Sequence, residues 1–418
     1  MRATSARQAS EPLLTRVLLF TGKGGVGKTS VAAATAARAA GRGARVLVTS
    51  TDPAHSLGDA LDAPLGDRAT AVPAPVAPGG ALFAQQIDAQ QRLERHWREV
   101  RDYLVALLSW GGVGEVEAEE LLLLPGLDEL FALIDLREQV TSGRYDLVVV
   151  DCAPTAETLK LLSLPEALRW YADRIFGARR GLGRAALPLT RALGPSGAPL
   201  PLPGTAVLGQ VERVHGELAE VHRLLRDPSR SSVRLVLAPE RLAVAEAQRT
   251  ATSVALFGYA IDAVVVNRLL PEHVTDPFLA RWRERQGEHL REVEDGFAPI
   301  RVLRAPLARD EPIGVAALAA LADALYGPVD ESAVLTDRPT VELVDDADGH
   351  RLRLALPFAT GDDVDLHRRG TELTLRVGSV KRTLPLPAAL AREDVVGARL
   401  TDGWLELRFA AVATAVTP

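Results

Sequence analysis

The sequence predicts an α/β fold, a parallel sheet with helices on both faces, followed by a small all-β sandwich. Two observations carry this prediction. Up to residue 325, short runs rich in Val, Leu and Ile alternate with longer helical stretches, a pattern typical of a parallel sheet with helical crossovers. After Tyr326-Gly327-Pro328 the chain changes to short runs, several of alternating apolar and polar residues, separated by Gly, Asp and Pro. This second pattern is typical of antiparallel strands.

The expected elements of the α/β part follow one another in a regular order. Its strands are the apolar runs 16–20, 45–50, 146–150, 234–238, 261–266 and 300–303. Residues 29–41 are rich in Ala and lack Pro, which predicts the first helix. The alternation is interrupted by two segments, 90–140, which is helical in pattern, and 163–230, which is less regular and contains an Arg/Gly/Pro-rich stretch at 179–204. An amphipathic helix is expected at the end of the second segment, with an apolar stripe of Val211, Val214, Leu218, Val221, Leu224 and Leu225.

These patterns divide the chain into four parts. We expect a flexible polar tail at 1–12, an α/β domain at 13–327, a linker at 328–340 and a β domain at 341–412. The helical segments would form a subdomain of the second part. The β domain is predicted from five short runs, at 341–344, 351–356, 371–377, 380–386 and 404–409.

Composition excludes several classes of protein. The net charge of −6 over 418 residues gives no general attraction to nucleic acid or to anionic lipid. No apolar run approaches the ~18 residues that a membrane-spanning helix needs, and no apolar stretch of a signal peptide follows the first residues. We therefore expect a cytoplasmic protein without a membrane span. Cys152 is the single cysteine, so a disulfide within the chain and a zinc or iron–sulfur site built from cysteines are excluded.

The strongest motif is the segment 22–29, called the phosphate loop below. It reads GKGGVGKT and matches the pattern G-x-x-x-x-G-K-S/T between an apolar run and an Ala-rich helix. Its glycines allow backbone N–H groups to point at phosphates, Lys28 would reach the β- and γ-phosphates, and the Thr29 hydroxyl would bind Mg²⁺. The helix that follows presents its positive end to the same anion. We predict that ATP or ADP, with Mg²⁺, is bound by Gly22, Lys23, Gly24, Gly25, Val26, Gly27, Lys28, Thr29 and Ser30.

Two carboxylates follow apolar runs, at the sheet edge where open α/β sheets bind ligands. Asp151 ends the run 147–150, and we expect it to hold Mg²⁺, through a water molecule, together with Thr29 and Asp52. Asp52 follows the run 45–50 and could orient or deprotonate the water that attacks the γ-phosphate. The alternative for Asp52 is a simple turn residue before Pro53. Asp52, Lys23 and Lys28 are the predicted catalytic residues.

Three motifs resemble those of one known family. A lysine directly after the first glycine, Lys23, resembles the deviant Walker A motif of the signature-lysine ATPases, which include the ParA/MinD, nitrogenase iron protein and ArsA/Get3 families. Residues 50–59, STDPAHSLGD, resemble the switch I of the ArsA/Get3 family. Residues 151–159 resemble its switch II, although Cys152, Ala156 and Glu157 replace the usual Thr, Gly and His. The chain is identified as a member of the ArsA/Get3 family.

The resemblance implies roles for individual residues. It implies an ATP-dependent homodimer in which Lys23 crosses the interface to the phosphates of the partner subunit. It also implies that Asp52 handles the attacking water, that Asn267 hydrogen-bonds the adenine base and that Pro306 lies near that base. Residues 124–129, LPGLDE, match a further family segment. The β domain resembles the small-heat-shock, α-crystallin-like module found in some relatives, with the alternative that it serves only oligomerisation or stability.

The resemblance also frames the function. It implies ATP hydrolysis coupled to the capture or targeting of apolar, tail-anchor-like helices, with a membrane receptor as a further partner. The family places the client groove at 100–124 and 163–225, whereas the simpler expectation is that these apolar stripes pack inside the subunit or the dimer. Two alternatives stay open. A ParA/MinD-like switch would need a DNA or membrane surface, which the acidic charge disfavours, and a metalloid pump ATPase would need more thiolates than Cys152 supplies.

Overall fold

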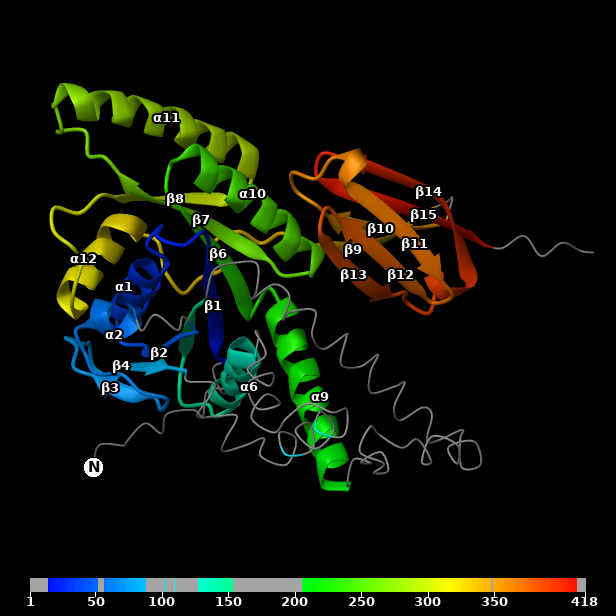
Figure 1. Cartoon of the computed structure of the whole chain (residues 1–418), viewed down its shortest axis with the longest axis horizontal. Coiled ribbons are helices and arrows are strands. Elements are labelled where there is room, and N and C mark those ends of the chain that lie inside the picture. Colours follow the sequence, from blue (N-terminus) through cyan, green and yellow to red (C-terminus); the bar gives the residue numbers. More distant parts are fainter. Residues whose placement is uncertain are drawn as a thin grey trace, which may run out of the picture.

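The computed structural model describes residues 14–51, 56–87, 127–152, 205–346 and 349–411, together with Asp102 and Ser109. The predicted tail, Asp52, and most of the helical segments before residues 127 and 205 lie outside these residues. The described residues form a mostly parallel sheet flanked by helices and a separate antiparallel β domain (Figure 1). This confirms the predicted fold class.

The sheet of the α/β domain has eight strands in the order β3-β4-β2-β5-β1-β6-β7-β8. All neighbouring strands are parallel except the edge pair β3–β4. The sequence pattern did not reveal β3 and β4, because β3 has three residues and β4 ends on two glutamines. The strands are β1 Arg16–Thr21, β2 Arg45–Ser50, β3 Thr70–Val72, β4 Ala81–Gln86, β5 Leu147–Asp151, β6 Ser231–Leu237, β7 Ile261–Leu269 and β8 Arg301–Pro306.

Seven α-helices are described, and no described helix is long and apolar enough to cross a membrane. The first of them follows the phosphate loop and is buried over most of its length, because its alanines are small enough to pack closely against the sheet and against α12. The helices are α1 Lys28–Gly41, α2 Ser56–Leu61, α6 Leu127–Thr141, α9 Thr205–Arg226, α10 Arg241–Leu256, α11 Pro277–Phe297 and α12 Val315–Tyr326.

Helix α9 carries the predicted amphipathic stripe, and the described part of that stripe faces inward. Leu218, Val221 and Leu225 are each at most 2% exposed. The same helix is held to α6 by Arg137, which forms ion pairs with Glu217 and Glu220. Leu218, Val221 and Leu225 are therefore part of the subunit core, whereas Leu224 of the same stripe is half-buried.

The β domain consists of two antiparallel sheets packed face to face, of strand order β14-β15-β10-β9 and β11-β12-β13. Strands β11 and β14 were not predicted. In β11 a polar run, His367-Arg368-Arg369, ends the strand, and in β14 a bulge between Val395 and Gly397 interrupts the alternation. The strands are β9 Val341–Asp346, β10 Gly349–Ala355, β11 Val364–Arg369, β12 Glu372–Val377, β13 Val380–Pro385, β14 Glu393–Thr401 and β15 Trp404–Ala411.

The β domain rests on the ends of α10 and α11. The rings of Phe297 and Phe358 lie 4.8 Å apart, and Thr252 Oγ1 donates a hydrogen bond of 2.5 Å to the carbonyl of Pro357. The guanidinium of Arg382, which is only 3% exposed, donates to the Leu256 carbonyl. The two domains are thus joined by an aromatic contact and by hydrogen bonds from both sides.

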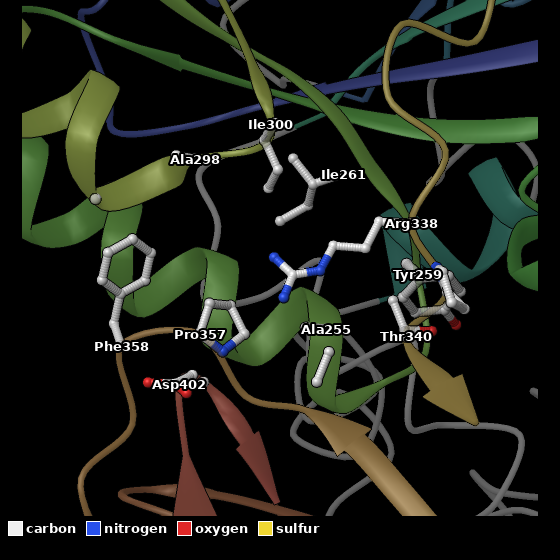
Figure 2. A pocket seen from close by; sticks show the side chains of 14 residues that line it. Ala255, Tyr259, Ile261, Ala298, Ile300, Arg338, Thr340, Pro357, Phe358 and Asp402 are labelled. Atoms are coloured by element: carbon white, nitrogen blue, oxygen red, sulfur yellow. The ribbon is translucent and has the colours of Figure 1, made fainter. Parts of the chain in front are cut away.

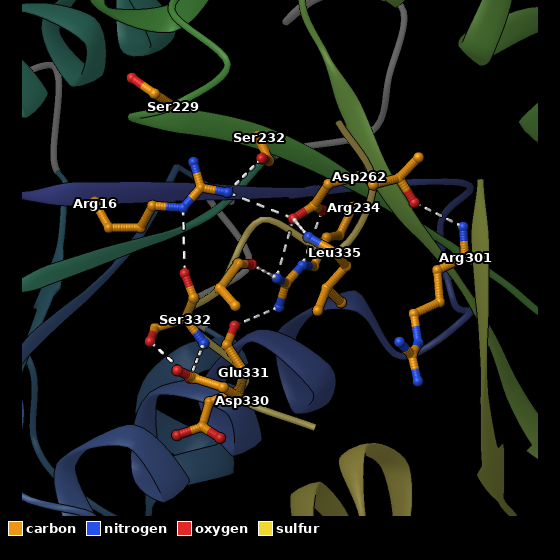
Figure 3. A network of polar contacts seen from close by, with 12 residues as sticks. Arg16, Ser229, Ser232, Arg234, Asp262, Arg301, Asp330, Glu331, Ser332 and Leu335 are labelled. Atoms are coloured by element: carbon orange, nitrogen blue, oxygen red, sulfur yellow. Dashed lines mark hydrogen bonds and ion pairs between the residues drawn. The ribbon is translucent and has the colours of Figure 1, made fainter. Parts of the chain in front are cut away.

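The first half of the predicted linker lies against the α/β domain. Glu331 is 2% exposed, forms an ion pair of 3.1 Å with Arg38 of α1 and accepts a hydrogen bond of 3.1 Å from Arg42, which directly follows α1. Arg234 of β6 donates to the carbonyls of Glu331 and Ala333, at 2.7 and 3.1 Å (Figure 3). The chain is therefore fixed to the first helix and to the sheet before it enters the β domain.

At the centre of this network is a fully buried ion pair. Arg234 and Asp262 have no exposed side-chain surface, and Arg234 Nε and Nη2 lie 3.0 and 3.1 Å from the two carboxylate oxygens (Figure 3). Burial acts to lower the pKa of Arg234, but interactions with Tyr326 and Asp262 outweigh it and leave this pKa raised. In neighbouring Arg16, burial dominates and lowers the pKa to about 10.

Candidate nucleotide site

The phosphate loop connects β1 to α1 at the carboxyl edge of the sheet. Gly22 has a φ of 153°, and a Cβ there would lie 2.0 Å from the Val236 carbonyl oxygen of β6, so this position requires glycine. Gly27 precedes α1 with a φ of 88°. No side chain caps the amino end of α1, and its first turn contains no acidic residue. Its backbone N–H groups and positive helix end are therefore suited to bind an anion.

The two lysines of the phosphate loop differ in their surroundings. Lys28 is 7% exposed, and its Nζ donates to the Lys23 carbonyl at 3.3 Å, so its ammonium lies over the loop. Lys23 is half-buried, and its ammonium has no hydrogen bond or ion pair with any residue that the structure describes. The Lys28 ammonium thus contacts the loop itself, whereas the Lys23 ammonium has no polar partner among the described residues.

Hydroxyls and a carboxylate gather next to the loop, in the arrangement that a magnesium site needs. Thr29 Oγ1 donates to Asp151 Oδ2 at 2.7 Å, and Ser50 Oγ donates to the same oxygen at 3.2 Å. Ser56 Oγ lies 3.2 Å from Thr29 Oγ1. Asp151 is 1% exposed. Oxygen donors of this kind are the ligands that Mg²⁺ prefers, often with water molecules retained between ion and protein, so these residues fit the ion.

Ser50 and Ser56 were not singled out from the sequence as members of the site. Ser50 is the last residue of β2 and pairs in register with Asp151 of β5, and Ser56 is the first residue of α2. A signal was available, because both serines flank the segment that holds Asp52. Asp52 itself and residues 153–159 lie outside the described residues, as do 124–126 of the LPGLDE segment.

Asn267 packs directly against the phosphate loop. The side chain is 6% exposed, its Nδ2 donates to the Val26 carbonyl at 2.9 Å and its Oδ1 accepts from the Arg268 N–H at 2.9 Å. A Cβ at Gly27 would lie 2.4 Å from that Nδ2, so the glycine makes the approach of Asn267 possible. Asn267 therefore supports the loop, a function that the sequence did not suggest. Pro306 is exposed at the end of β8, where it pairs with Leu269 of β7.

The arrangement as a whole can hold a nucleoside triphosphate. A glycine loop and a helix end would bind the phosphates, Thr29 and Asp151 supply oxygens for a divalent cation, and the carboxyl ends of β7 and β8 lie beside the loop. Cys152 follows Asp151 and is buried at 3% exposure. We find no reason to give its thiol a chemical role, since reactive cysteines are accessible.

Two family models match the chain. Residues 15–327 match the family described as anion-transporting ATPase, and residues 347–409 match the HSP20-like domain found in ArsA. The two matches together cover most of the α/β domain and of the β domain.

Similar proteins occur in bacteria and in plants. A putative arsenical pump-driving ATPase of Chlorobaculum tepidum is 35% identical over 396 residues, which are 94% of this chain and 96% of that protein. An uncharacterized protein of Streptomyces coelicolor is 39% identical over 401 residues, 94% of this chain and 97% of that protein. The ATPase GET3B of Arabidopsis thaliana is 31% identical over 325 residues, 73% of this chain and 77% of that protein.

Proposed function

Because the chain belongs to the ArsA/Get3 family of anion-transporting ATPases, we propose that it hydrolyses ATP, with Mg²⁺, at the phosphate loop and acts as a homodimer. The observation that carries the proposal is the geometry around α1. Lys28 lies over the loop, and Thr29 and Asp151 share a hydrogen bond of 2.7 Å at its end. These are the positions that phosphoryl transfer requires for phosphate binding and for the cation.

In this proposal the residues of the chain mainly position and neutralise the reacting groups. Backbone N–H groups of the phosphate loop and the Lys28 ammonium bind the β- and γ-phosphates. Thr29 and Asp151 would hold Mg²⁺, directly or through water, and the ion would supply positive charge to neutralise the phosphate oxygens. Asp52 orients the attacking water and accepts its proton, so that ADP and inorganic phosphate are formed.

Lys23 gives the proposed site its dependence on a second subunit. Its ammonium has no partner among the described residues, and it stands at the start of a loop whose other lysine is already engaged. We place it against the phosphates of the partner subunit. Lys23→Ala should then bind ATP as the native protein does but hydrolyse it slowly, and the rate should no longer rise with protein concentration. Equal rates for both proteins would contradict this placement.

Hydrolysis is tested most simply with two variants. Lys28→Ala should abolish both binding and hydrolysis, whereas Asp52→Asn should keep ATP bound and stop hydrolysis. Bound nucleotide is measured by equilibrium dialysis and released phosphate by a coupled assay. If Asp52→Asn hydrolyses ATP at the native rate, Asp52 does not activate the water.

We further propose that the ATP cycle drives capture or targeting of apolar, tail-anchor-like client helices. Family membership, the relative named GET3B and the HSP20-like β domain support this idea. Within the expected client groove at 100–124 and 163–225, Leu218, Val221 and Leu225 are buried and would not contact a client. A peptide with an apolar helical segment should co-purify with the native protein in ATP but not with Lys28→Ala. Binding no better than to an unrelated ATPase would refute the client function.

A second candidate is the ATPase subunit of a metalloid pump, which the names of two relatives favour. Against it, Cys152 is the only cysteine of the chain and is 3% exposed. The test is the ATPase rate with arsenite or antimonite added. Stimulation that Cys152→Ser removes would establish this candidate, and an unchanged rate would exclude it.

A further inference from the structure

A cavity of about 190 Å³ lies where the β domain meets the α/β domain (Figure 2). We call it the seam cavity. It lies near the amino end of the sheet, because Ile261 is the first residue of β7 and Ile300 directly precedes β8. The phosphate loop is at the opposite, carboxyl edge. The seam cavity is lined by Ala255, Tyr259, Ile261, Gly296, Ala298, Ile300, Arg338, Pro339, Thr340, Ala355, Pro357, Phe358, Asp402 and Gly403.

The walls of the seam cavity are slightly more apolar than polar and are fixed by contacts outside it. Ile261 is 6% exposed. Phe358 packs on Phe297, and a Cβ at Gly296 would approach its ring to 3.3 Å, so this glycine allows the ring to close the wall. Pro357 is held by its hydrogen bond from Thr252. Since these contacts join both domains, the cavity is a formed feature of the seam.

Arg338 places a positive charge in the middle of the seam cavity. Its side chain comes from the segment between the domains, and its guanidinium lies between Ile261 and Ile300 on one side and Pro357 on the other (Figure 2). The guanidinium carbon lies over the ring of Trp404, 5.3 Å from the ring centroid. The guanidinium forms no hydrogen bond or ion pair with any residue in the part of the chain that the structure describes.

A half-buried guanidinium with its N–H donors directed into a cavity is suited to a particular class of ligand. Its planar fork matches a carboxylate in a bidentate pair. Asp402 at the rim of the same cavity is exposed and forms no ion pair with Arg338. Its negative charge disfavours ligands with a second negative charge. Charge and lining together select a monoanion with an apolar body.

We propose that the seam cavity binds a small organic monoanion, an aromatic or branched aliphatic carboxylate. The carboxylate pairs with Arg338, and the apolar body lies against Ile261, Ile300 and Pro357. A volume of about 190 Å³ is far above the ~10–15 Å³ that one water molecule occupies in the same measure, so the cavity has room for a small organic ligand. The proposal is independent of the nucleotide site, because the two lie at opposite edges of the sheet.

The test uses three fluorinated probes of similar size but different charge on the full chain without nucleotide. Their binding is followed by fluorine NMR. We expect 4-fluorobenzoate to bind at least tenfold more tightly than neutral 4-fluorobenzyl alcohol, and cationic 4-fluorobenzylamine not to bind. If the three probes bind equally, or if 4-fluorobenzoate does not bind at millimolar concentration, the proposal is wrong.

Variants then assign the binding to the seam cavity. Arg338→Met keeps the length of the side chain and removes its charge, so it should weaken 4-fluorobenzoate at least tenfold, whereas Arg338→Lys should keep part of the affinity. Arg353→Met is the matched control, because Arg353 also lies over Trp404, at 4.7 Å, but does not line the cavity. It should bind as the native protein does. Native affinity in Arg338→Met, with an unchanged melting temperature, would overturn the assignment.

Discussion

The buried pair between Arg234 and Asp262 gives a sharp prediction about stability. Both side chains have no exposed surface, and Asp262 also accepts from Arg16 at 3.4 Å and from the Leu335 N–H at 3.3 Å. Asp262→Ala would leave the Arg234 guanidinium buried without its counter-ion, although Arg234 would keep the carbonyls of Glu331 and Ala333. Breaking such a pair costs about 3–5 kcal/mol.

The magnitude can be expressed as a melting temperature. For a domain of this size, each kcal/mol shifts the melting temperature by roughly 2–4 °C, so Asp262→Ala should lower it by about 6 to 20 °C. Differential scanning calorimetry measures the transition of the α/β domain. The matched control is Asp146→Ala, which breaks a 2.6 Å pair with Arg45 that is 46% and 29% exposed. Surface pairs contribute roughly 0.2–1 kcal/mol.

A double variant separates charge burial from simple loss of packing. Arg234→Met with Asp262→Leu replaces the pair by apolar groups of similar size, and such replacements often restore stability. The double variant should therefore be more stable than Asp262→Ala. If Asp262→Ala melts within a few degrees of Asp146→Ala, the buried pair does not carry the stability that its geometry suggests.

The remaining predictions concern pH and the nucleotide site. Burial, reinforced by Arg226 and Arg382, lowers the pKa of His222 to about 3, so the stability tied to its neutral form is present above pH ~6.5 and is lost as the pH falls toward 3. Between pH 7 and pH 5 the free energy of unfolding of the native protein should fall by on the order of 2 kcal/mol more than that of His222→Gln. An equal fall in both proteins would contradict this prediction. Because Lys28→Ala should abolish ATP binding, phosphate release at a fixed ATP concentration should fall by more than about 10²-fold, and a loss below tenfold would exclude a role for its ammonium in the reaction. Asn267→Ala removes the hydrogen bond to Val26, and nucleotide competition should show weaker binding of ATP and GTP alike if the residue only supports the loop, but a selective loss of ATP if it also reads adenine.

The sequence predicted the features that depend on local pattern. The phosphate loop and its helix follow from residues that are adjacent in the chain, and Asp151 follows from its position at the end of an apolar run. The parallel sheet follows from alternation, and its topology brings Asp151 to Thr29 because β1 and β5 are neighbours. The predicted fold class is confirmed because each of its patterns rests on a few consecutive residues, whereas the roles of the phosphate loop and of Asp151 in binding nucleotide and Mg²⁺ stay predictions.

Other features depend on contacts between distant parts of the chain, and the sequence did not reveal them. Asn267 reaches Val26 across 241 residues, and Glu331, within an expected linker, is buried against Arg38. The stripe on α9 predicted a helix correctly but not which surface it covers, because amphipathic periodicity is the same for a helix that packs inside a subunit and for one that binds a partner. The seam cavity is formed by five separate segments of the chain, so no local sequence pattern predicts it.

The most direct test of the proposed ATPase is a structure of the chain with Mg²⁺, ADP and aluminium fluoride, in which the fluoride complex stands for the transferred phosphoryl group. We predict ADP on the phosphate loop, Mg²⁺ beside Thr29 and Asp151, and the fluoride complex between Lys28 and a water held by Asp52. We also predict that Lys23 of the partner subunit contacts the same phosphates. Nucleotide bound away from residues 22–29, or a complex in which Lys23 faces solvent in a monomer, would contradict the proposal.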